Sequence, residues 1–249
     1  MCLAVFEWSP NSEYPLRLVA NRDEFRARPT APMAWWPDNP ILAGKDLEAG
    51  GTWLGVSKDK KFALLTNIRP GFVGKKGELS RGHLVSNYLK GSMGIEAYHQ
   101  QVLSDIARYA GFNLILGDTK QLFWFSSNHK EGTWLTEGIH AVSNDALNTP
   151  WPKLLLAKKQ LMEQRELLTS TLTNHGILQS AKQAARNQLP ITGVPLEWEE
   201  KLSAQTINGA DYGTRCRTHM VLRRDHYMRV AEQQIDQNGN ITSVAQFEF

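Results

Sequence analysis

The order of strand-like and helix-like segments is the feature that most constrains how this chain can fold. Apolar, β-prone segments come in three groups along the sequence, and helical stretches separate each group from the next. Strands that follow one another without an intervening helix usually pair as antiparallel hairpins, so this order disfavours alternating βαβ units. We therefore predict an α+β fold, a four-layer αββα sandwich of two antiparallel sheets with helices outside them.

Local patterns set the expected limits of these segments. The stretch that contains Pro29, Pro32, Pro37 and Pro40 is predicted to be a loop, because proline cannot donate a backbone hydrogen bond. Ser80 is expected to cap the first helix. The predicted strands are 2–8, 16–21, 52–57, 62–67, 112–118, 121–127, 138–144, 218–224, 227–235 and 241–249, and the predicted helices are 81–91, 95–109 and 150–168.

Composition excludes several classes of protein. With 249 residues, of which 41% are hydrophobic and 21% charged, the chain is ordinary for a globular protein, and without a linker or repeat it is predicted to form a single domain over 1–249. The net charge of +3 is spread along the chain and forms no dense basic stripe, so we expect no nucleic-acid partner. The opening resembles no signal peptide, and no apolar run approaches the roughly 20 residues that span a bilayer. A cytoplasmic protein without an integral membrane segment is expected.

The cysteines point to neither a disulfide framework nor a metal site. Cys2 and Cys216 are the only two, and neither lies in a CxxC spacing. Asp23 and Glu24 are adjacent in a predicted strand, where neighbouring side chains point to opposite faces, and no His-x-His or HExxH partner accompanies them. We therefore expect no metal centre.

Cys2 is the first candidate for chemistry. Methionine aminopeptidases remove Met1 when the second residue is small, so the mature chain can begin with a cysteine that carries both a thiol and a free α-amine. Such an amine titrates near pH 8, so its uncharged fraction can take the proton of the adjacent thiol. The alternative is that Cys2 is a small apolar residue that packs at the start of a strand.

The motif Asn21-Arg22-Asp23-Glu24 supports the functional interpretation. If strands 2–8 and 16–21 pair across the turn at residues 9–15, residues 20–23 return beside Cys2. Asp23 would then orient the α-amine, and Arg22 would lower the thiol pKa or bind an anionic group. The alternative is a strand-end turn with solvated charges.

Four further residues are candidates for ligand binding, each with a structural alternative. Trp53 follows two glycines in GGTWLG and is expected to form a wall of a binding loop, or else to sit in a bulged core strand. Arg81 begins a predicted helix, where an anion can bind, although a simple helix cap explains it equally. His83 and His219 lie beside arginines and are candidate haem ligands, whereas most histidines have structural roles.

Several motifs together resemble one known family. The segments MCLAVFEW, VANRDEF and AGGTWLGVSKDKKFALLTNIR, followed by SRGHLV, GFNLILGD, GIHAVSN and YGTRCRTHMVL, are similar in content and order to the NRDE family, the homologues of transport and Golgi organisation protein 2. The resemblance covers nearly the whole chain. It implies a Cys-type N-terminal-nucleophile (Ntn) hydrolase-like fold. It also implies intracellular haem trafficking, with haem as cargo rather than a required cofactor and apo-haemoproteins as partners.

A more distant resemblance links the chain to the bile-salt hydrolase and penicillin acylase group. It implies a nucleophile, an Asp that holds the α-amine, an oxyanion donor, an amine-binding amide and a late active-site Arg. The Arg that precedes the Asp by three residues in that group is Ala20 here, and Arg22 stands two places further along. The resemblance implies these catalytic residues: Cys2 as nucleophile, Asp23 as the holder of the α-amine, Asn67 as oxyanion donor, Asn144 as amine-binding amide and Arg215 as the late active-site Arg.

Two functional hypotheses follow. In the first, which the family resemblance favours, the pocket binds haem or a similar amphipathic anion, with Arg22, Arg81 or Arg215 facing its propionates. In the second, Cys2 attacks an amide or thioester, and the chain is an amidohydrolase or thioesterase. Fold analogy alone does not decide between them.

Overall fold

The computed structural model describes residues 2–37, 39–69 and 77–249. The chain divides into two compact units, one formed by Met1–Ala27 with Glu137–Phe249 and the other by Arg28–Thr136. Each unit consists of one antiparallel sheet and its helices, so the predicted α+β class with two antiparallel sheets is confirmed. The assignment of 1–249 to one domain remains a prediction. No helix among the described residues is long and apolar enough to cross a membrane.

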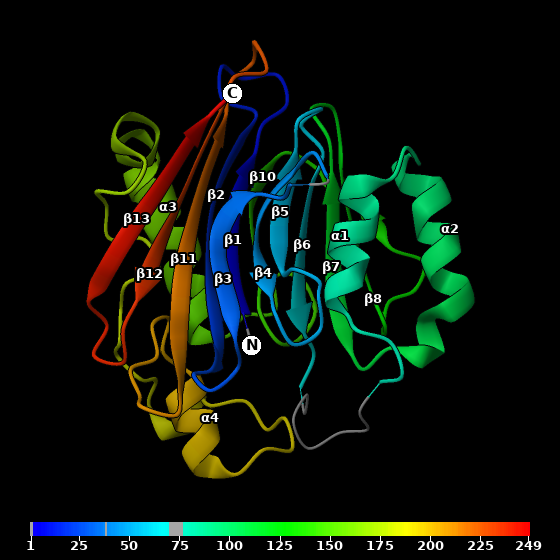
Figure 1. Cartoon of the computed structure of the whole chain (residues 1–249). Coiled ribbons are helices and arrows are strands. Elements are labelled where there is room, and N and C mark those ends of the chain that lie inside the picture. The colour runs from blue at the N-terminus through cyan, green and yellow to red at the C-terminus, as the bar shows by residue number, and fades with distance from the viewer. Residues whose placement is uncertain (1, 38, 70–76) are drawn as a thin grey trace. The chain divides into compact units, whose positions relative to one another are not determined.

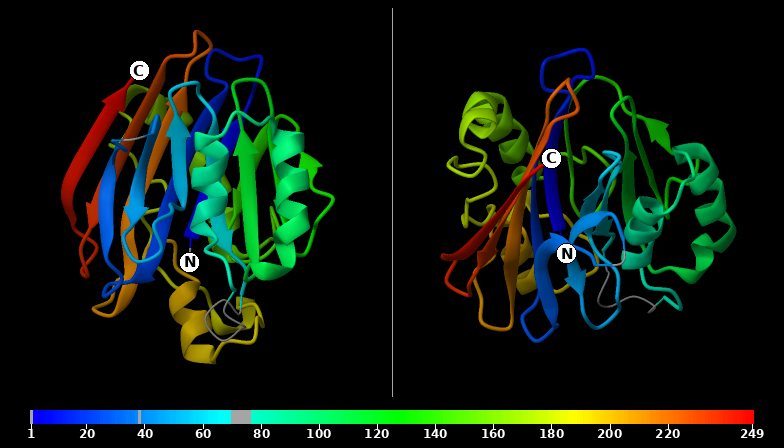
Figure 2. Two further views of the ribbon diagram at one scale, coloured as in Figure 1. Left: turned by 45° about the vertical axis from the view of Figure 1, so that its right-hand side comes forward. Right: turned by 45° about the horizontal axis from the view of Figure 1, so that its top comes forward.

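The first unit contains a six-stranded sheet in the order β10-β1-β2-β11-β12-β13 (Figures 1 and 2). Its central strands β2 and β11 are long and almost fully buried. Two helices and a short 3₁₀ turn follow β10. The elements are β1 (Cys2–Trp8), β2 (Leu16–Phe25), β10 (Gly138–Val142), α3 (Pro152–Thr171), η2 (Arg186–Gln188), α4 (Leu196–Leu202), β11 (Tyr212–Leu222), β12 (Met228–Ile235) and β13 (Ile241–Glu248).

Helix α3 covers one face of this sheet (Figure 1), which is called the α3 face here. Alternate residues of the strands, among them Leu3, Val5 and Val19, pack there against buried leucines of α3 such as Leu154 and Leu161. Removing a side chain of this kind from water contributes about 1.5–3 kcal/mol to folding. The intervening strand residues point to the opposite face, called the Cys2 face because it carries that residue.

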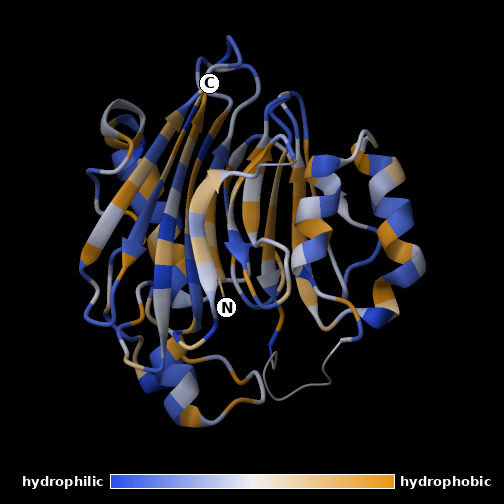
Figure 3. Cartoon of the chain, in the orientation of Figure 1, coloured by the Kyte–Doolittle hydropathy of each residue, from blue (hydrophilic) through white to orange (hydrophobic). Residues whose placement is uncertain are grey.

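The second unit contains a seven-stranded sheet in the order β3-β4-β5-β6-β7-β8-β9. Helix α1 packs on its central strands, and α1 and α2 share a core with β6 and β7. Figure 3 shows the hydrophobic colouring of β7, three of whose residues belong to this core. The elements are β3 (Thr30–Trp35), β4 (Ile41–Asp46), β5 (Leu54–Ser57), β6 (Phe62–Asn67), α1 (Gly82–Lys90), α2 (Ile95–Asp105), η1 (Ile106–Arg108), β7 (Phe112–Gly117), β8 (Leu122–Ser126) and β9 (Thr133–Trp134).

Two local predictions were wrong. The proline-rich stretch forms β3 and β4, because Pro32 lies in an edge strand where a bulge between Ala31 and Ala34 interrupts the ladder. Helix α1 has Arg81 rather than Ser80 at its N-cap, with no side-chain cap hydrogen bond. The remaining predicted strands and helices are present within a few residues of their expected limits, except that β11 begins six residues earlier, at Tyr212.

A buried histidine pair lies on the α3 face of the first unit. His219 Nδ1 is 3.0 Å from His175 Nε2, and His219 Nε2 is 3.1 Å from Gln233 Oε1. Burial lowers the pKa of His175 to about 4 and that of His219 to about 3, with the neighbouring histidine adding to the shift of His219. Both folded-state pKa values lie below the usual value of 6.5. At a pH between each folded-state pKa and 6.5, the unfolded chain therefore binds more protons than the folded chain.

We therefore expect stability to be fully present above about pH 6.5 and to fall as the pH drops toward about 4. The loss between about pH 7 and pH 5 should amount to about 2–4 kcal/mol for the pair. Thermal or denaturant unfolding across this range measures it. His219→Gln should flatten the pH dependence, and an unchanged slope in that variant would show that other groups cause it.

Candidate functional site

Cys2 lies at one end of a row of buried side chains on the Cys2 face. It pairs directly with Arg22 on β2, and Arg22 pairs in turn with Cys216 on β11. Directly opposed residues of antiparallel strands point to the same face, so the side chain of Arg22 leaves the sheet between those of the two cysteines, and its charge opposes the rise in both thiol pKa values. The predicted return of residues 20–23 to Cys2 is confirmed. Ala20, which stands where the more distant group has an Arg, pairs with Ala4. The positive charge opposite Cys2 therefore comes from Arg22.

The other residues of the NRDE motif have separate structural tasks. Asn21 points to the α3 face, where its amide nitrogen donates to the carbonyl oxygens of Leu178 and Gln205 at 2.9 and 2.8 Å. Arg217 donates to the side-chain oxygen of Asn21 at 3.0 Å. Asn21 therefore ties β2 to the loops behind the sheet, while Arg22 faces Cys2.

Asp23 is buried beside β11. The hydroxyl of Thr214 donates to Asp23 Oδ1 at 2.6 Å and accepts from the backbone N–H of Ile207 at 2.9 Å. Burial raises the pKa of Asp23, and the Thr214 hydrogen bond opposes this rise. Asp23 also interacts electrostatically with the Cys2 thiol, as expected for a carboxylate one residue beyond Arg22. Its role toward the α-amine remains a prediction.

A β-bulge places Arg215. The ladder between β2 and β11 shifts between Thr214 and Cys216, so Arg215 is the extra residue of β11. Its Nη1 donates to the carbonyl oxygens of Phe25 and Arg26, at 3.0 and 3.3 Å. The bulge thus turns Arg215 toward the end of β2 that carries Arg22.

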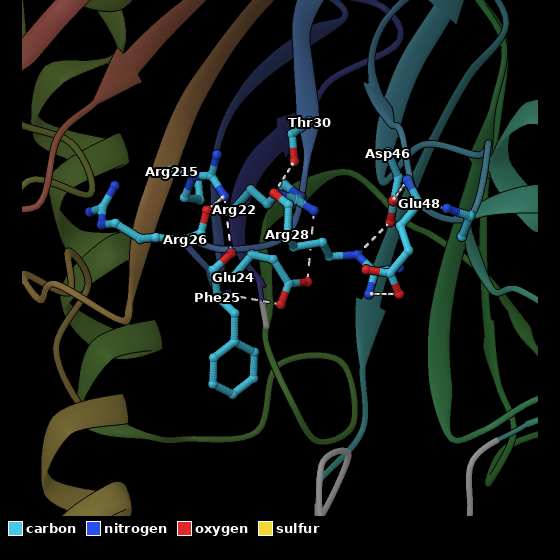
Figure 4. Close-up of polar contacts among 10 residues, drawn as sticks. Arg22, Glu24, Phe25, Arg26, Arg28, Thr30, Asp46, Glu48 and Arg215 are labelled. Carbon is cyan, nitrogen blue, oxygen red and sulfur yellow. Dashed lines mark hydrogen bonds and ion pairs between the residues drawn. The ribbon is translucent and has the colours of Figure 1, made fainter.

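Three guanidinium groups gather at this end of the sheet (Figure 4). Burial lowers the pKa of Arg215, and the charges of Arg22 and Arg26 lower it further. Arg22 lies 3.7 Å from the carboxylate of Glu24, a longer separation than that of a hydrogen-bonded ion pair. Arg26 is anchored to the carbonyl oxygens of Gly209, Ile235, Thr214 and Asp236. The Cys2 thiol therefore feels the positive charge of Arg22 together with the negative charges of Asp23 and Glu24.

The turn after β10 fixes the backbone of Cys2. The hydroxyl of Ser143 lies 2.9 Å from the carbonyl oxygen of Cys2 and 3.1 Å from Oδ1 of Asn144, and both residues are buried. Burial raises the pKa of the Cys2 thiol, while Arg22 is one of the groups that oppose this rise. The structure thus brings Asn144 into the surroundings of residue 2, as the sequence comparison implied.

Cys216 is buried near the carboxylate of Glu232. Burial raises its pKa well above the usual value, and the buried carboxylate of Glu232 adds to the rise. Sequence reasoning missed Ser143, Thr214 and Glu232 as members of this cluster. The first two adjoin predicted residues in AVSN and GTRCRT, whereas Glu232 carries no sequence signal because only the pairing of β12 with β11 brings it there.

The other predicted residues lie elsewhere in the fold. His219 points to the α3 face, with both ring nitrogens in contact with His175 and Gln233. The remaining four belong to the unit Arg28–Thr136. There Asn67 ends β6, the ring of Trp53 lies over Gly44, Arg81 donates to the carbonyl oxygen of Gly111 at 2.9 Å, and His83 is an exposed residue of α1.

Comparison with known proteins identifies the family. The sequence model of the family described as "Transport and Golgi organisation 2" matches residues 1–237. The chain belongs to this family. The Bos taurus "Transport and Golgi organization protein 2 homolog" is 31% identical over 259 aligned residues, which cover 94% of this chain and 92% of the relative. The Mus musculus homologue is 32% identical over 267 residues, covering 97% and 91%. The family resemblance predicted from the motifs is confirmed.

A solved structure also resembles the chain. The Caenorhabditis elegans N-acylethanolamine-hydrolyzing acid amidase ortholog aligns with 70% of this chain and 88% of its own, at 10% sequence identity and a TM-score of 0.41.

The two thiols should differ in reactivity. We expect iodoacetamide to modify Cys2 before Cys216 at neutral pH, because the pKa of Cys216 is raised further and thiolate is the reactive form. Peptide mapping after timed alkylation of native protein measures both rates. Faster labelling of Cys216 would place the reactive thiol on β11 and contradict the assignment of the site to Cys2.

Proposed function

We propose that this chain binds haem at the Cys2 end of its six-stranded sheet and carries it between proteins inside the cell. The observation that carries this proposal is the group of three arginines, Arg22, Arg26 and Arg215, at one end of β2, where Arg22 pairs with Cys2. Haem is an amphipathic dianion whose two propionates require cationic partners. Membership of the transport and Golgi organisation 2 family supports the same class of task.

The charge balance favours an anionic ligand. Arg26 donates from three of its nitrogens to four backbone carbonyl oxygens, whereas Arg215 donates to two through Nη1, so we expect a ligand to engage Arg22 and Arg215. Each lies near the other, and burial together with this repulsion already lowers the pKa of Arg215. A carboxylate placed between them would relieve the repulsion and form charge-assisted hydrogen bonds. Two guanidinium groups fit the two propionates of one haem.

The iron requires a separate ligand. His219 does not fit this role, because it is fully buried on the α3 face and both of its ring nitrogens already have partners. His83 is an exposed residue of α1 in the unit Arg28–Thr136, and its role as an iron ligand stays a prediction from the sequence. Substitution of His83 by Ala tests its contribution independently of the arginines.

Titration of the purified protein with ferric haem should shift the Soret band and saturate near one haem per chain. The double variant Arg22→Gln and Arg215→Gln should weaken binding by about 100-fold or more, since each of the two hydrogen bonds to a charged group contributes about 1.5–3 kcal/mol. Loaded protein should then transfer haem to an apo-haemoprotein.

The matched control is Arg223→Gln, which removes an exposed arginine paired with Asp225 in the turn after β11. It should leave haem affinity unchanged. Equal affinity in the control, the double variant and the parent would contradict propionate binding by Arg22 and Arg215. Absence of a Soret shift in the parent would contradict haem binding altogether.

A second candidate function is hydrolysis of an amide or thioester, and the fixed backbone of residue 2 favours it. Ser143 contacts the Cys2 carbonyl, and Asp23 and Asn144 are buried nearby. After removal of Met1, the α-amine would take the thiol proton as sulfur attacks the substrate carbonyl, and would then donate it to the leaving group. Water would hydrolyse the acyl-enzyme. Asn67 remains the proposed oxyanion donor.

Cys2→Ala separates this candidate from haem transport. It should abolish turnover of an acyl-amide and thioester panel while leaving ligand binding largely intact, because the thiol is needed for the chemical step. The intact mass of protein from its own host shows whether Met1 has been removed. Cys2-dependent turnover together with no Soret shift would replace the haem proposal by the hydrolase.

A further inference from the structure

The two sheets have four edges within the described residues, and three of them carry features that prevent pairing with another chain. At β10, Asn148 accepts from the N–H of Ala141 at 3.0 Å and donates its own N–H to the Ala141 carbonyl at 2.8 Å. At β3, Pro32 removes a donor and a bulge breaks the ladder. At β9, the strand has only two residues. These are known means of avoiding edge-to-edge association.

The fourth edge, β13, has none of these protections along its central and C-terminal part. It is eight residues long, and its sequence ITSVAQFE contains no proline, no lysine and one charged residue at its end. Its bulge lies at its beginning, opposite Gln234 and Ile235. Ile241 and Val244 are nearly half exposed. Figure 2 shows this red strand at the outer edge of its sheet, with β12 as its strand neighbour.

The register of β13 shows which backbone groups its edge presents. Phe249 and Met228 exchange both backbone hydrogen bonds, at 3.1 and 2.9 Å. Hydrogen-bonded pairs alternate along an antiparallel ladder, so Phe247 and Ala245 also bond inward to β12. The N–H and C=O groups of the intervening residues, Val244, Gln246 and Glu248, therefore point outward from the sheet.

We propose that β13 is a dimerisation edge, at which a second copy of this chain adds its own β13 antiparallel across a two-fold axis. The outward residues are spaced two positions apart along β13. An antiparallel register can therefore place them opposite the same residues of the second copy and pair every outward N–H with a carbonyl. The two six-stranded sheets then become one continuous sheet across the interface.

Charge permits this self-pairing. Residues 241–247 carry no charged side chain, so no like charges oppose each other along the contact. The single acidic residue, Glu248, already has Arg229 at 3.3 Å on β12. The exposed side chain of Val244 would lose contact with water in the dimer.

Sedimentation equilibrium of the full chain from about 1 to 200 μM should show a reversible monomer–dimer equilibrium. Val244→Pro should raise the dimer dissociation constant at least tenfold, because it removes an outward donor on both sides of the axis. The same variant retains the bonds between β13 and β12, since the N–H of Val244 points away from β12. Val244→Thr keeps the donor and serves as the matched control.

Amide exchange gives a readout that does not depend on any variant. The N–H groups of Val244, Gln246 and Glu248 should become protected as concentration rises, whereas those of Ala245 and Phe247 should be protected throughout. If Val244→Pro fails to fold, Gln246→Pro removes another outward N–H donor and tests the same pairing. A monomer at all concentrations, or a dimer that survives both proline variants without alternating protection, overturns the proposal.

Discussion

The pairing of Cys2 with Arg22, and of Arg22 with Cys216, organises the rest of the first unit. It places an arginine on the strand between two buried cysteines, on the same face of the sheet. A buried charge is costly without partners, so the surroundings of Arg22 are polar, with Glu24 close by and Asp23 next along the strand. Thr214 and the bulge at Arg215 adjust β11 to this arrangement.

This arrangement also explains why four consecutive residues of β2 can be polar inside a sheet. Alternation sends Asn21 to the α3 face, where it binds backbone carbonyls, and Arg22 to the Cys2 face. Asp23 receives a hydrogen bond from β11, and Glu24 lies near the surface at the end of the strand. Each side chain thus has a different partner, and a shift of one residue in register would disrupt all of them.

Part of this could be read from the sequence, because hairpin register follows from two short strands and the turn between them. That step brought Arg22 to Cys2 correctly. Other features depend on pairing between distant segments. Glu232 reaches Cys216 only through the β11–β12 ladder, and the bulge at Arg215 has no composition signal. The prolines between Pro29 and Pro40 suggested a loop, although an edge strand tolerates proline.

The most direct test of the central role of Arg22 is the apparent pKa of the Cys2 thiol, measured from the pH dependence of its alkylation rate. Arg22→Gln removes a charge that lowers this pKa, so the account predicts a higher apparent pKa in the variant than in the parent. Arg223→Gln, which removes an exposed arginine, should leave the value unchanged. An identical Cys2 pKa in Arg22→Gln and the parent would contradict the claim that Arg22 sets the electrostatics of this site.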